Sequence, residues 1–393
     1  MKHALLLALL PLAAQAQTQL SGRVLDAQTR QPVPYASITV PGTTQGTTAN
    51  AEGEFALSVR QLPAKVLAFS LGYGRDSVQV AQPGATLAFK LAPAPIQLPG
   101  AEPPSYAAEL LTKAYRVLQH THERQLYGQA LYRQISTLDQ RPTQVLEMFW
   151  QARASSTGLQ GTKLDQGRFA EKKGNLIKVS ALSAYTRGIV LYDTRDDSTK
   201  FGNVLSASPT AHYALRLLGI SQGSGQQLAE VAFEEKEVLP TSHHIKGILT
   251  IDTDTYQVLR YRVGLDVSIR SNNPTFKFRD SRMECDFVFA PRPGGTIPDH
   301  FTVTLAETIG RLLKSDVHML VVGTTYFYAW QPTAPAVVYE PASSKVRDLD
   351  AIKQLPYDPA FWRNNPVVKR TPQEEAAIQS FEQEKAFGTM LNK

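Results

Sequence analysis

Cysteine is almost absent from this sequence, which has only Cys285 among 393 residues. A lone thiol cannot form an intrachain disulfide, and a zinc site built from several cysteines is excluded. Blocks of one charge are also missing. The 41 Lys and Arg and the 35 Asp and Glu are scattered and give a net charge of +6. This distribution does not indicate nucleic-acid binding.

Long hydrophobic runs are missing as well. Beyond the N-terminus no window reaches the roughly 20 apolar residues of a transmembrane helix. The longest candidate, residues 319–330, is interrupted by Gly323. The chain is nevertheless 42% hydrophobic and contains 15 Tyr and 16 Phe. This composition excludes a disordered protein, and the length fits two or three domains that each bury a core.

The first residues predict export. Lys2 is followed by an apolar run over residues 4–10 and by the small-x-small sequence Ala14-Gln15-Ala16. This order is typical of a signal peptide over residues 1–16, cleaved after Ala16. A buried N-terminal helix is the alternative. No Cys follows the apolar run, so we expect no lipoprotein anchor. The predicted location is the periplasm or the outer-membrane surface.

Residues 18–92 are predicted to form a small β-sandwich. Short β-rich runs at 20–25, 35–40, 54–59, 66–71, 77–80 and 86–91 are separated by Gly, Pro and Asn. Six or seven strands at this spacing fit two packed sheets. The segment has no cluster of His, Cys or carboxylate side chains that indicates chemistry.

An ordered set of motifs runs through the same segment: Gly22-Arg23-Val24, Pro32-Val33-Pro34-Tyr35-Ala36, Asn50-Ala51-Glu52-Gly53-Glu54-Phe55 and Phe69-Ser70-Leu71-Gly72-Tyr73. This set resembles the carboxypeptidase regulatory-like domain, a transthyretin-like β-sandwich common in exported proteins of Bacteroidota. The resemblance implies an envelope location and a non-catalytic accessory role, since this module is the accessory unit in metallocarboxypeptidases.

A second, larger unit is expected after a linker. Residues 93–104 contain five prolines and predict a semi-rigid spacer. Residues 105–124 then predict a packed amphipathic helix, and the region 105–330 returns to an antiparallel β pattern. Its hairpin at 247–261 resembles those in the curved open sheets of periplasmic lipoprotein carriers. The fold class is therefore mainly β, with the sandwich and a larger sheet that is curved and open by this resemblance.

The tail, residues 331–393, is predicted to be extended and then helical. Thr371, Pro372 and Glu374 form the pattern of a helix N-terminus with a capping box. The following apolar stripe is narrow, with Ile378 and Phe381, and it suits docking on the sheet or on a partner protein.

A zinc site is the most specific chemical alternative. His120 and Glu123 have the H-x-x-E spacing of metallocarboxypeptidase ligands, and His243 is a candidate third ligand. However, the pair ends an amphipathic helix, the accessory domain would precede its catalytic domain, and no Glu occurs between Glu307 and Glu340. A polar helix end explains His120 more simply, because the helix dipole favours it there. We therefore predict no metal and no cofactor.

Two further motifs are weighed in the same way. Ser221 lies in a G-x-S-x-G sequence, but a nucleophile elbow needs a strand before it and a helix after it. Here residues 212–218 favour a short helix, with Gly219 as its C-cap. Asp193, Asp196 and Asp197 suit calcium, but Arg195 among them favours a solvated turn.

Aromatic residues are concentrated at Phe149, Trp150, 326–328 and Trp330. They suit either an ordinary core or an apolar ligand cavity. The sequence thus predicts a non-catalytic exported envelope protein that acts as a binding module, scaffold or accessory. Its expected partner is an envelope protein or an outer-membrane assembly. The alternatives are a periplasmic carrier of a lipid or other apolar ligand and a zinc peptidase using His120, Glu123 and His243.

Overall fold

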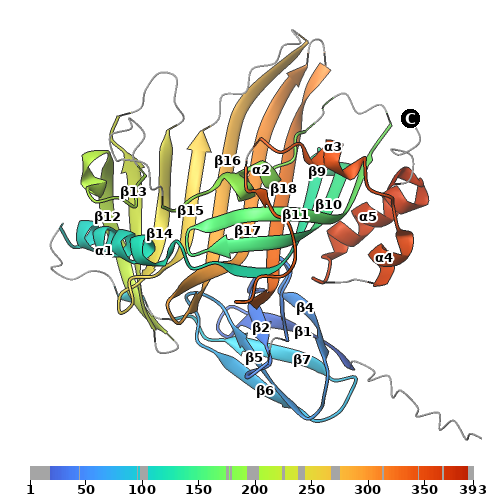
Figure 1. Ribbon diagram of the computed structural model, residues 1–393. Helices are drawn as coiled ribbons and strands as arrows, with labels where there is room; N and C mark the ends of the chain where they lie inside the picture. Colours follow the sequence, from blue (N-terminus) through green and yellow to red (C-terminus); the bar gives the residue numbers. More distant parts are fainter. Residues whose placement is uncertain are drawn as a thin grey trace, which may run out of the picture.

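The fold comes from a computed structural model that describes residues 18–43, 45–94, 96–97, 105–173, 177, 179–192, 203–223, 226–237, 244–266, 275–311, 314–343, 345–364 and 367–387. The predicted signal peptide, the Asp193 to Asp197 cluster and His243 lie outside these residues. Among the described residues, none of the helices is long and apolar enough to cross a membrane. The fold is mainly β, as predicted, with two units (Figure 1).

The N-terminal unit is a sandwich of two small sheets. One has the order β4-β1-β7 and the other β3-β2-β5-β6. The strands are β1 (Thr18–Asp26), β2 (Ser37–Thr39), β3 (Gly46–Thr48), β4 (Glu54–Val59), β5 (Ala64–Phe69), β6 (Asp76–Val80) and β7 (Thr86–Leu91). Inward residues alternate with outward ones, so both sheets contribute apolar side chains to one core.

Gly22 on β1 shows how tightly this core is packed. A Cβ atom there would lie 2.6 Å from the ring of Phe55 on β4 and 2.3 Å from the carbonyl oxygen of Leu87 on β7. The missing side chain lets Phe55 cross over β1 and pack against Phe89, with ring centroids 5.8 Å apart. Glycine is therefore a packing requirement here.

The second unit is a sheet of twelve strands in the order β19-β11-β10-β9-β18-β17-β16-β15-β14-β13-β12-β8, with antiparallel neighbours throughout. The strands are β8 (Ile96–Gln97), β9 (Leu126–Leu138), β10 (Arg141–Ser155), β11 (Gly158–Glu171), β12 (Tyr213–Gly223), β13 (Gln226–Glu235), β14 (Ile245–Asp252), β15 (Val258–Asp266), β16 (Phe276–Arg292), β17 (Gly295–Arg311), β18 (Lys314–Gln331) and β19 (Glu340–Pro341).

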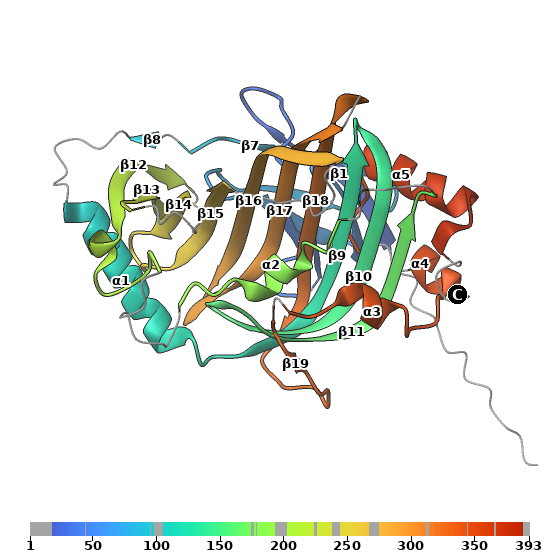
Figure 2. The same cartoon turned by 90° about the horizontal axis from the view of Figure 1, so that it is seen from above.

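The sheet is curved and open, and Figure 2 shows its concave side, here called the inner face. Two helices lie on this face: α1 (Ser105–Thr121) against β12 and β17, and α2 (Ser183–Gly188) against β11, β17 and β18. The apolar stripe of α1 (Ala107, Leu110, Leu111, Ala114 and Leu118) is buried in the largest core cluster. A 3-10 turn, η1 (Pro209–Ala211), precedes β12.

A row of aromatic rings crosses the inner face from β12 to β18. Neighbouring centroids lie 4.9 to 6.3 Å apart through Tyr213, Phe233, Tyr261, Phe287, Phe301 and Phe327. Strand β14 lies between the strands of Phe233 and Tyr261 and has Gly247 at this level. A Cβ on Gly247 would lie 2.6 Å from Phe233 Cζ, so its absence lets the two rings stack across β14.

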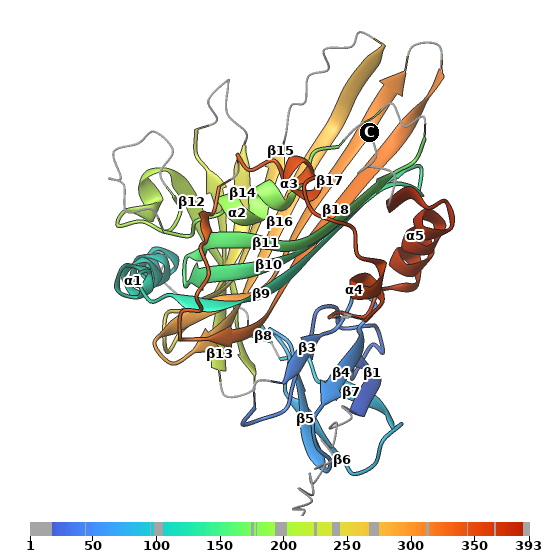
Figure 3. The same ribbon diagram turned by 45° about the vertical axis from the view of Figure 1, so that its right-hand side comes forward.

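The tail contains α3 (Asp348–Ile352), α4 (Pro359–Asn364) and α5 (Pro372–Gln383). Helices α4 and α5 lie on the opposite, outer face of β9 to β11, next to the sandwich (Figure 3). Helix α5 begins with the predicted capping box. The Thr371 hydroxyl accepts the Glu374 backbone N–H, and the Glu374 carboxylate accepts the Thr371 backbone N–H.

One predicted element is wrong. Residues 212–218 form most of strand β12 and not a helix. Leu and Ala have high helix propensity, but Tyr213, Leu215 and Leu217 alternate toward the core, and β13 provides a pairing partner along β12. Tertiary pairing outweighs local propensity here. The predicted linker also contains strand β8, whose Gln97 pairs with Ile220 of β12.

Candidate functional site

The sandwich docks on the outer face of β17 and β18 through Tyr35. This residue has a positive φ of 56°, which is unfavourable for a non-glycine residue and is held in place by its surroundings. Its ring lies 5.0 Å from the ring of His300 and 6.3 Å from that of Tyr326. Burial raises the pKa of the Tyr35 hydroxyl, and hydrogen bonds with Thr324 and Thr302 offset part of the rise.

Polar contacts reinforce this junction. The Ser37 hydroxyl donates to Asp299 Oδ1 at 3.2 Å, and His300 Nδ1 lies 2.8 Å from Asp299 Oδ2. The sandwich also contacts the tail, where Lys369 Nζ lies 2.9 Å from Glu54 Oε2. These contacts join the sandwich, the sheet and the tail at one place.

A cleft remains between the sandwich and the sheet beside these contacts. It contains a cavity of about 250 Å³, lined by Tyr73 and Arg75 of the sandwich and by Arg260, Asp286 and Phe289 of the sheet, among others. A second hollow of about 460 Å³ shares Ser37, Phe69 and Asp299 with the first. The site is partly polar and partly aromatic, a mixture that suits recognition of a ligand with both kinds of surface.

The charged groups of the cleft are mostly paired. Arg260 Nε donates to Asp286 Oδ1 at 2.7 Å, and Arg260 Nη2 donates to Asp286 Oδ2. Burial raises the pKa of the Asp286 carboxyl, but the hydrogen bond and charge of Arg260 outweigh burial and hold that pKa below its usual value. The bidentate pair therefore forms a fixed charged wall of the cavity.

The cleft does not have the geometry of a Ser-His-Asp triad. In such a triad the histidine lies between the serine and the carboxylate and takes the serine proton. Here Ser37 donates to Asp299 directly, and His300 contacts the same carboxylate from the other side. The arrangement orients Asp299 as an acceptor, so its evident chemistry is hydrogen bonding.

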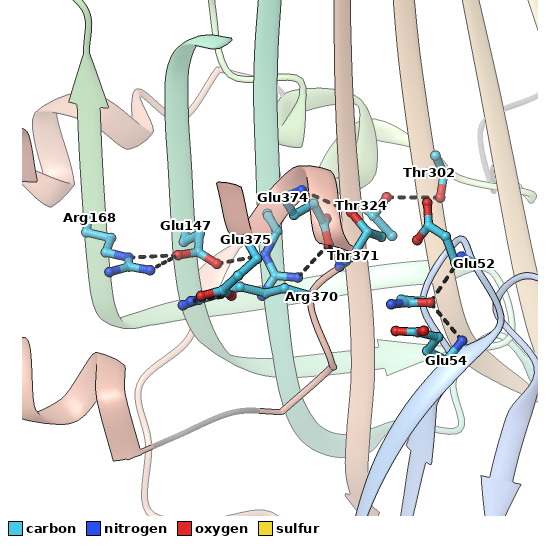
Figure 4. A network of polar contacts seen from close by, with 12 residues as sticks. Glu52, Glu54, Glu147, Arg168, Thr302, Thr324, Arg370, Thr371, Glu374 and Glu375 are labelled. Atoms are coloured by element: carbon cyan, nitrogen blue, oxygen red, sulfur yellow. Dashed lines mark hydrogen bonds and ion pairs between the residues drawn. The ribbon is translucent and has the colours of Figure 1, made fainter. Parts of the chain in front are cut away.

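A buried ionic row continues along the outer face to the tail (Figure 4). Glu147 on β10 accepts from Arg133 Nε of β9 at 2.7 Å and from Arg168 Nε of β11 at 2.7 Å. Burial raises the pKa of Glu147, but the charges of Arg168 and Arg133 outweigh it and lower the pKa to about 2. Arg133 Nη1 also donates to Glu374 of α5 at 3.3 Å, which ties the tail to the sheet.

The residues of the predicted zinc alternative have simpler surroundings. His120 Nδ1 donates to the Arg116 carbonyl oxygen at 2.6 Å at the end of α1, and the side chain of Glu123 is 88% exposed. His243 lies outside the described residues. Within the described part of the chain, no group of three or more His, Cys, Asp or Glu side chains is arranged to hold a metal ion.

Ser221 lies inside strand β12, opposite Leu228 of β13. The strand continues to Gly223, and the next element is another strand, so the strand-to-helix turn of a nucleophile elbow is not formed. Two grounds from the sequence argued against the elbow, a helix before Ser221 and a loop after it. The first is wrong, because Ser221 follows a strand, but the helix that an elbow needs after the serine is replaced by strand β13.

The six clustered aromatic residues do not line one cavity. Strand alternation places Trp150 and Phe327 with the inner-face cluster, and the irregularity at Ala329, which has a φ of 55°, lets Trp330 join them. Phe149, Tyr326 and Tyr328 lie on the outer face with Trp362 of α4. The cleft residues Asp299 and His300 were not predicted. The ionic row was missed as well, although a charged residue inside each of three long β runs is a usable signal of a polar site.

The fold and the cleft define a mainly β protein in which a small sandwich is docked on a large curved antiparallel sheet. Residues 20–99 match the family model of the CarboxypepD_reg-like domain. This confirms the resemblance seen in the sequence for about a fifth of the chain. No curated protein matches the chain.

Comparison with solved structures finds several chains of low similarity. A DUF1329 family protein from Desulfovibrio piger is 9% identical and covers 59% of this chain and 95% of its own, with a TM-score of 0.26. A domain assigned as an outer membrane lipoprotein-sorting protein from Vibrio parahaemolyticus is 12% identical and covers 57% and 92%, with a TM-score of 0.28. MucB, solved in complex with MucA(peri), is 13% identical and covers 58% and 100%, with a TM-score of 0.18.

Proposed function

We propose that this is a non-catalytic, exported cell-envelope protein that binds a ligand or partner at the cleft between its sandwich and its sheet. Export is inferred from the N-terminal sequence pattern. The family match of the sandwich supports an accessory role for it. In this view the sandwich and the sheet form one recognition unit.

The observation that carries the proposal is the strained anchor Tyr35 beside a polar cavity. A non-glycine residue at φ 56° has an energetic cost and persists only where the surrounding structure enforces it. Tyr35 is enclosed by His300 and Tyr326, and the adjoining cavity is lined by paired charges and aromatic rings. This combination supports the interpretation that the sandwich is fixed to the sheet so that the cleft between them keeps a defined shape. It argues against a sandwich that is only flexibly tethered.

Site-specific photo-crosslinking in cells tests the proposal. A photoreactive residue replaces Arg75, which is exposed at the cleft, or Lys65, which is exposed on β5 of the same sandwich and does not line the cavity. We expect the photoreactive residue at position 75 to give a discrete crosslinked adduct, and the one at position 65 to give little of it. Equal labelling at both positions, or none at position 75, would contradict the cleft as the binding site.

A carrier of apolar ligands is the second candidate function. The observation that favours it lies on the inner face, where apolar side chains at the ends of β15 and β16 are only partly covered: Leu265, Phe276 and Phe278. Extraction of the purified protein with organic solvent, followed by mass spectrometry, tests this candidate. The zinc peptidase remains a third prediction, and metal analysis of the wild type against His120→Ala tests it.

A further inference from the structure

The carboxyl group of Glu307 lies within the apolar inner face of the sheet. On β17 the residues Phe301, Val303, Leu305 and Ile309 alternate toward the core and are buried. Glu307 shares their face because side chains two residues apart in a strand point the same way. Its side chain is 4% exposed, so an ionisable group is buried among apolar neighbours.

The neighbouring strand is distorted at the position of Glu307. The register of β16 against β17 shifts between Arg279 and Arg282, and Asp280 has a φ of 53°. This bulge turns the Ser281 hydroxyl toward Glu307, and it donates to Oε1 at 2.5 Å. Bulges that re-aim a side chain are frequent at functional sites. Among the described residues, the second oxygen of Glu307 has no hydrogen-bond partner.

Apolar residues of the same core cluster flank Glu307: Met319 is its partner on β18, and Ile309, two residues further on β17, pairs with Phe278 of β16. Together with Phe276 and Leu265 of this cluster, they are here called the apolar wall. The wall lies at the ends of β15 to β18 that are remote from the sandwich, where β16 to β18 extend beyond α2 (Figure 1). The side chains of Leu265, Phe276 and Phe278 are partly exposed. On α2, which packs against β17 and β18, Tyr185 is 41% exposed.

The charge of Glu307 determines which ligand suits this wall. Burial raises the pKa of its carboxyl, and the Ser281 hydrogen bond only partly offsets the rise. Apolar surroundings disfavour the ionised form of a carboxyl group. A cation that pairs with it stabilises this form, whereas an anion beside it adds repulsion. A ligand with an apolar chain and a positive head group therefore suits this site, because the chain can pack on the wall and the head group can pair with the second oxygen of Glu307.

We propose that this wall binds an amphiphile whose alkyl chain lies on the apolar residues and whose primary ammonium group pairs with Glu307. The inference rests on the carrier function of the inner face and is independent of the interdomain cleft. Hydrogen bonds to charged groups are the strong ones, so the head group contributes selectivity and the chain contributes most of the affinity.

Titration of the whole protein with decylamine, decanol and decanoate, below their micelle concentrations, tests the proposal. In the wild type we expect decylamine to bind about tenfold more tightly than decanol, with decanoate weakest. In Glu307→Gln, which keeps the size of the side chain, the preference for the amine is expected to disappear. Glu284→Gln is the matched control, since Glu284 is exposed on the other face of β16 and its loss should leave the preference unchanged.

The outcomes separate the two ideas. Equal binding of the three compounds to the wild type, or an amine preference that survives in Glu307→Gln, overturns the role of Glu307 and leaves the carrier function standing. No binding of any of the three overturns both. The wild-type comparison of head groups does not depend on the folding of a variant.

Discussion

Glu374 on α5 and Arg133 on β9 are 241 residues apart in the chain, and their side chains meet with Arg133 Nη1 3.3 Å from Glu374 Oε2. The same Glu374 oxygen accepts the backbone N–H of Thr371 at 2.8 Å. One carboxylate therefore caps the tail helix and fastens it to the sheet. Because Arg133 also pairs with Glu147, the tail is connected to the buried ionic row.

Removing Glu147 is expected to be strongly destabilising. Glu147→Ala removes the buried carboxylate that Arg133 and Arg168 share and leaves them, among the described residues, only their ion pairs with Glu374 and Glu382. Breaking such a buried pair typically costs about 3–5 kcal/mol. Denaturant unfolding measures the loss. Glu284→Ala, an exposed change on β16, is the control and should cost less than about 0.5 kcal/mol. Equal effects of the two substitutions would show that the ionic row adds no stability.

Stability is expected to fall in acid because of the same residue. The pKa of Glu147 is about 2 in the folded protein, against its ordinary value of 4.5. A carboxyl with a lowered folded pKa contributes stability above its unfolded pKa and loses it as the pH falls toward the folded pKa. We expect a loss on the order of 3 kcal/mol between pH 4.5 and pH 2. In Glu147→Gln this part of the pH dependence should be absent.

The tail helix is expected to loosen without Glu374. Glu374→Ala removes both the cap contact and the ion pair to Arg133, so hydrogen exchange in α5 should accelerate, by about tenfold for a loss of roughly 1.4 kcal/mol. Glu375→Ala is the neighbouring control, because the contacts of Glu375 among the described residues, with Arg370 and Gln379, stay within its own segment. Similar exchange in both variants would argue against the dual role of Glu374.

The sandwich is expected to detach when its anchor is removed. Tyr35→Ala deletes the ring that packs on His300 and Tyr326, whereas Tyr35→Phe keeps the ring and loses only the hydroxyl. We expect faster proteolysis between the two units and a larger radius of gyration for Tyr35→Ala, with Tyr35→Phe close to the wild type. Unchanged scattering of the alanine variant would mean that other contacts hold the sandwich.

Two glycines of the curved sheet should respond differently to alanine. At Gly247 a Cβ would lie 2.1 Å from the Arg262 carbonyl oxygen, whereas at Gly264 the nearest atom would be 3.8 Å away. We expect Gly247→Ala to destabilise the protein by about 1–3 kcal/mol through overpacking and Gly264→Ala to be nearly neutral. Thermal unfolding compares the two, and an equally neutral Gly247→Ala would mean that the aromatic row moves freely.

Local sequence was sufficient for several elements. The Thr371-Pro372-Glu374 pattern predicted where α5 begins, because a capping box depends on residues within one helical turn. The turn between β9 and β10 is local in the same sense: Asp139 and Gln140 both have positive φ, which Asp tolerates better than most residues. The motifs of the sandwich identified its family because they are contiguous short segments.

The sequence by itself determined the mainly β class, the two units and the capped tail, since alternation, turn residues and caps act over a few neighbouring positions. Only the tertiary structure decided which strands became neighbours. Strand pairing divided the clustered aromatic residues between two faces and placed Glu307 on an apolar wall. Docking of the tail and of the sandwich on the sheet joined Arg133 to Glu374 and Ser37 to Asp299. These contacts join residues far apart in the chain, so they depend on sheet order and curvature, which no local pattern specifies.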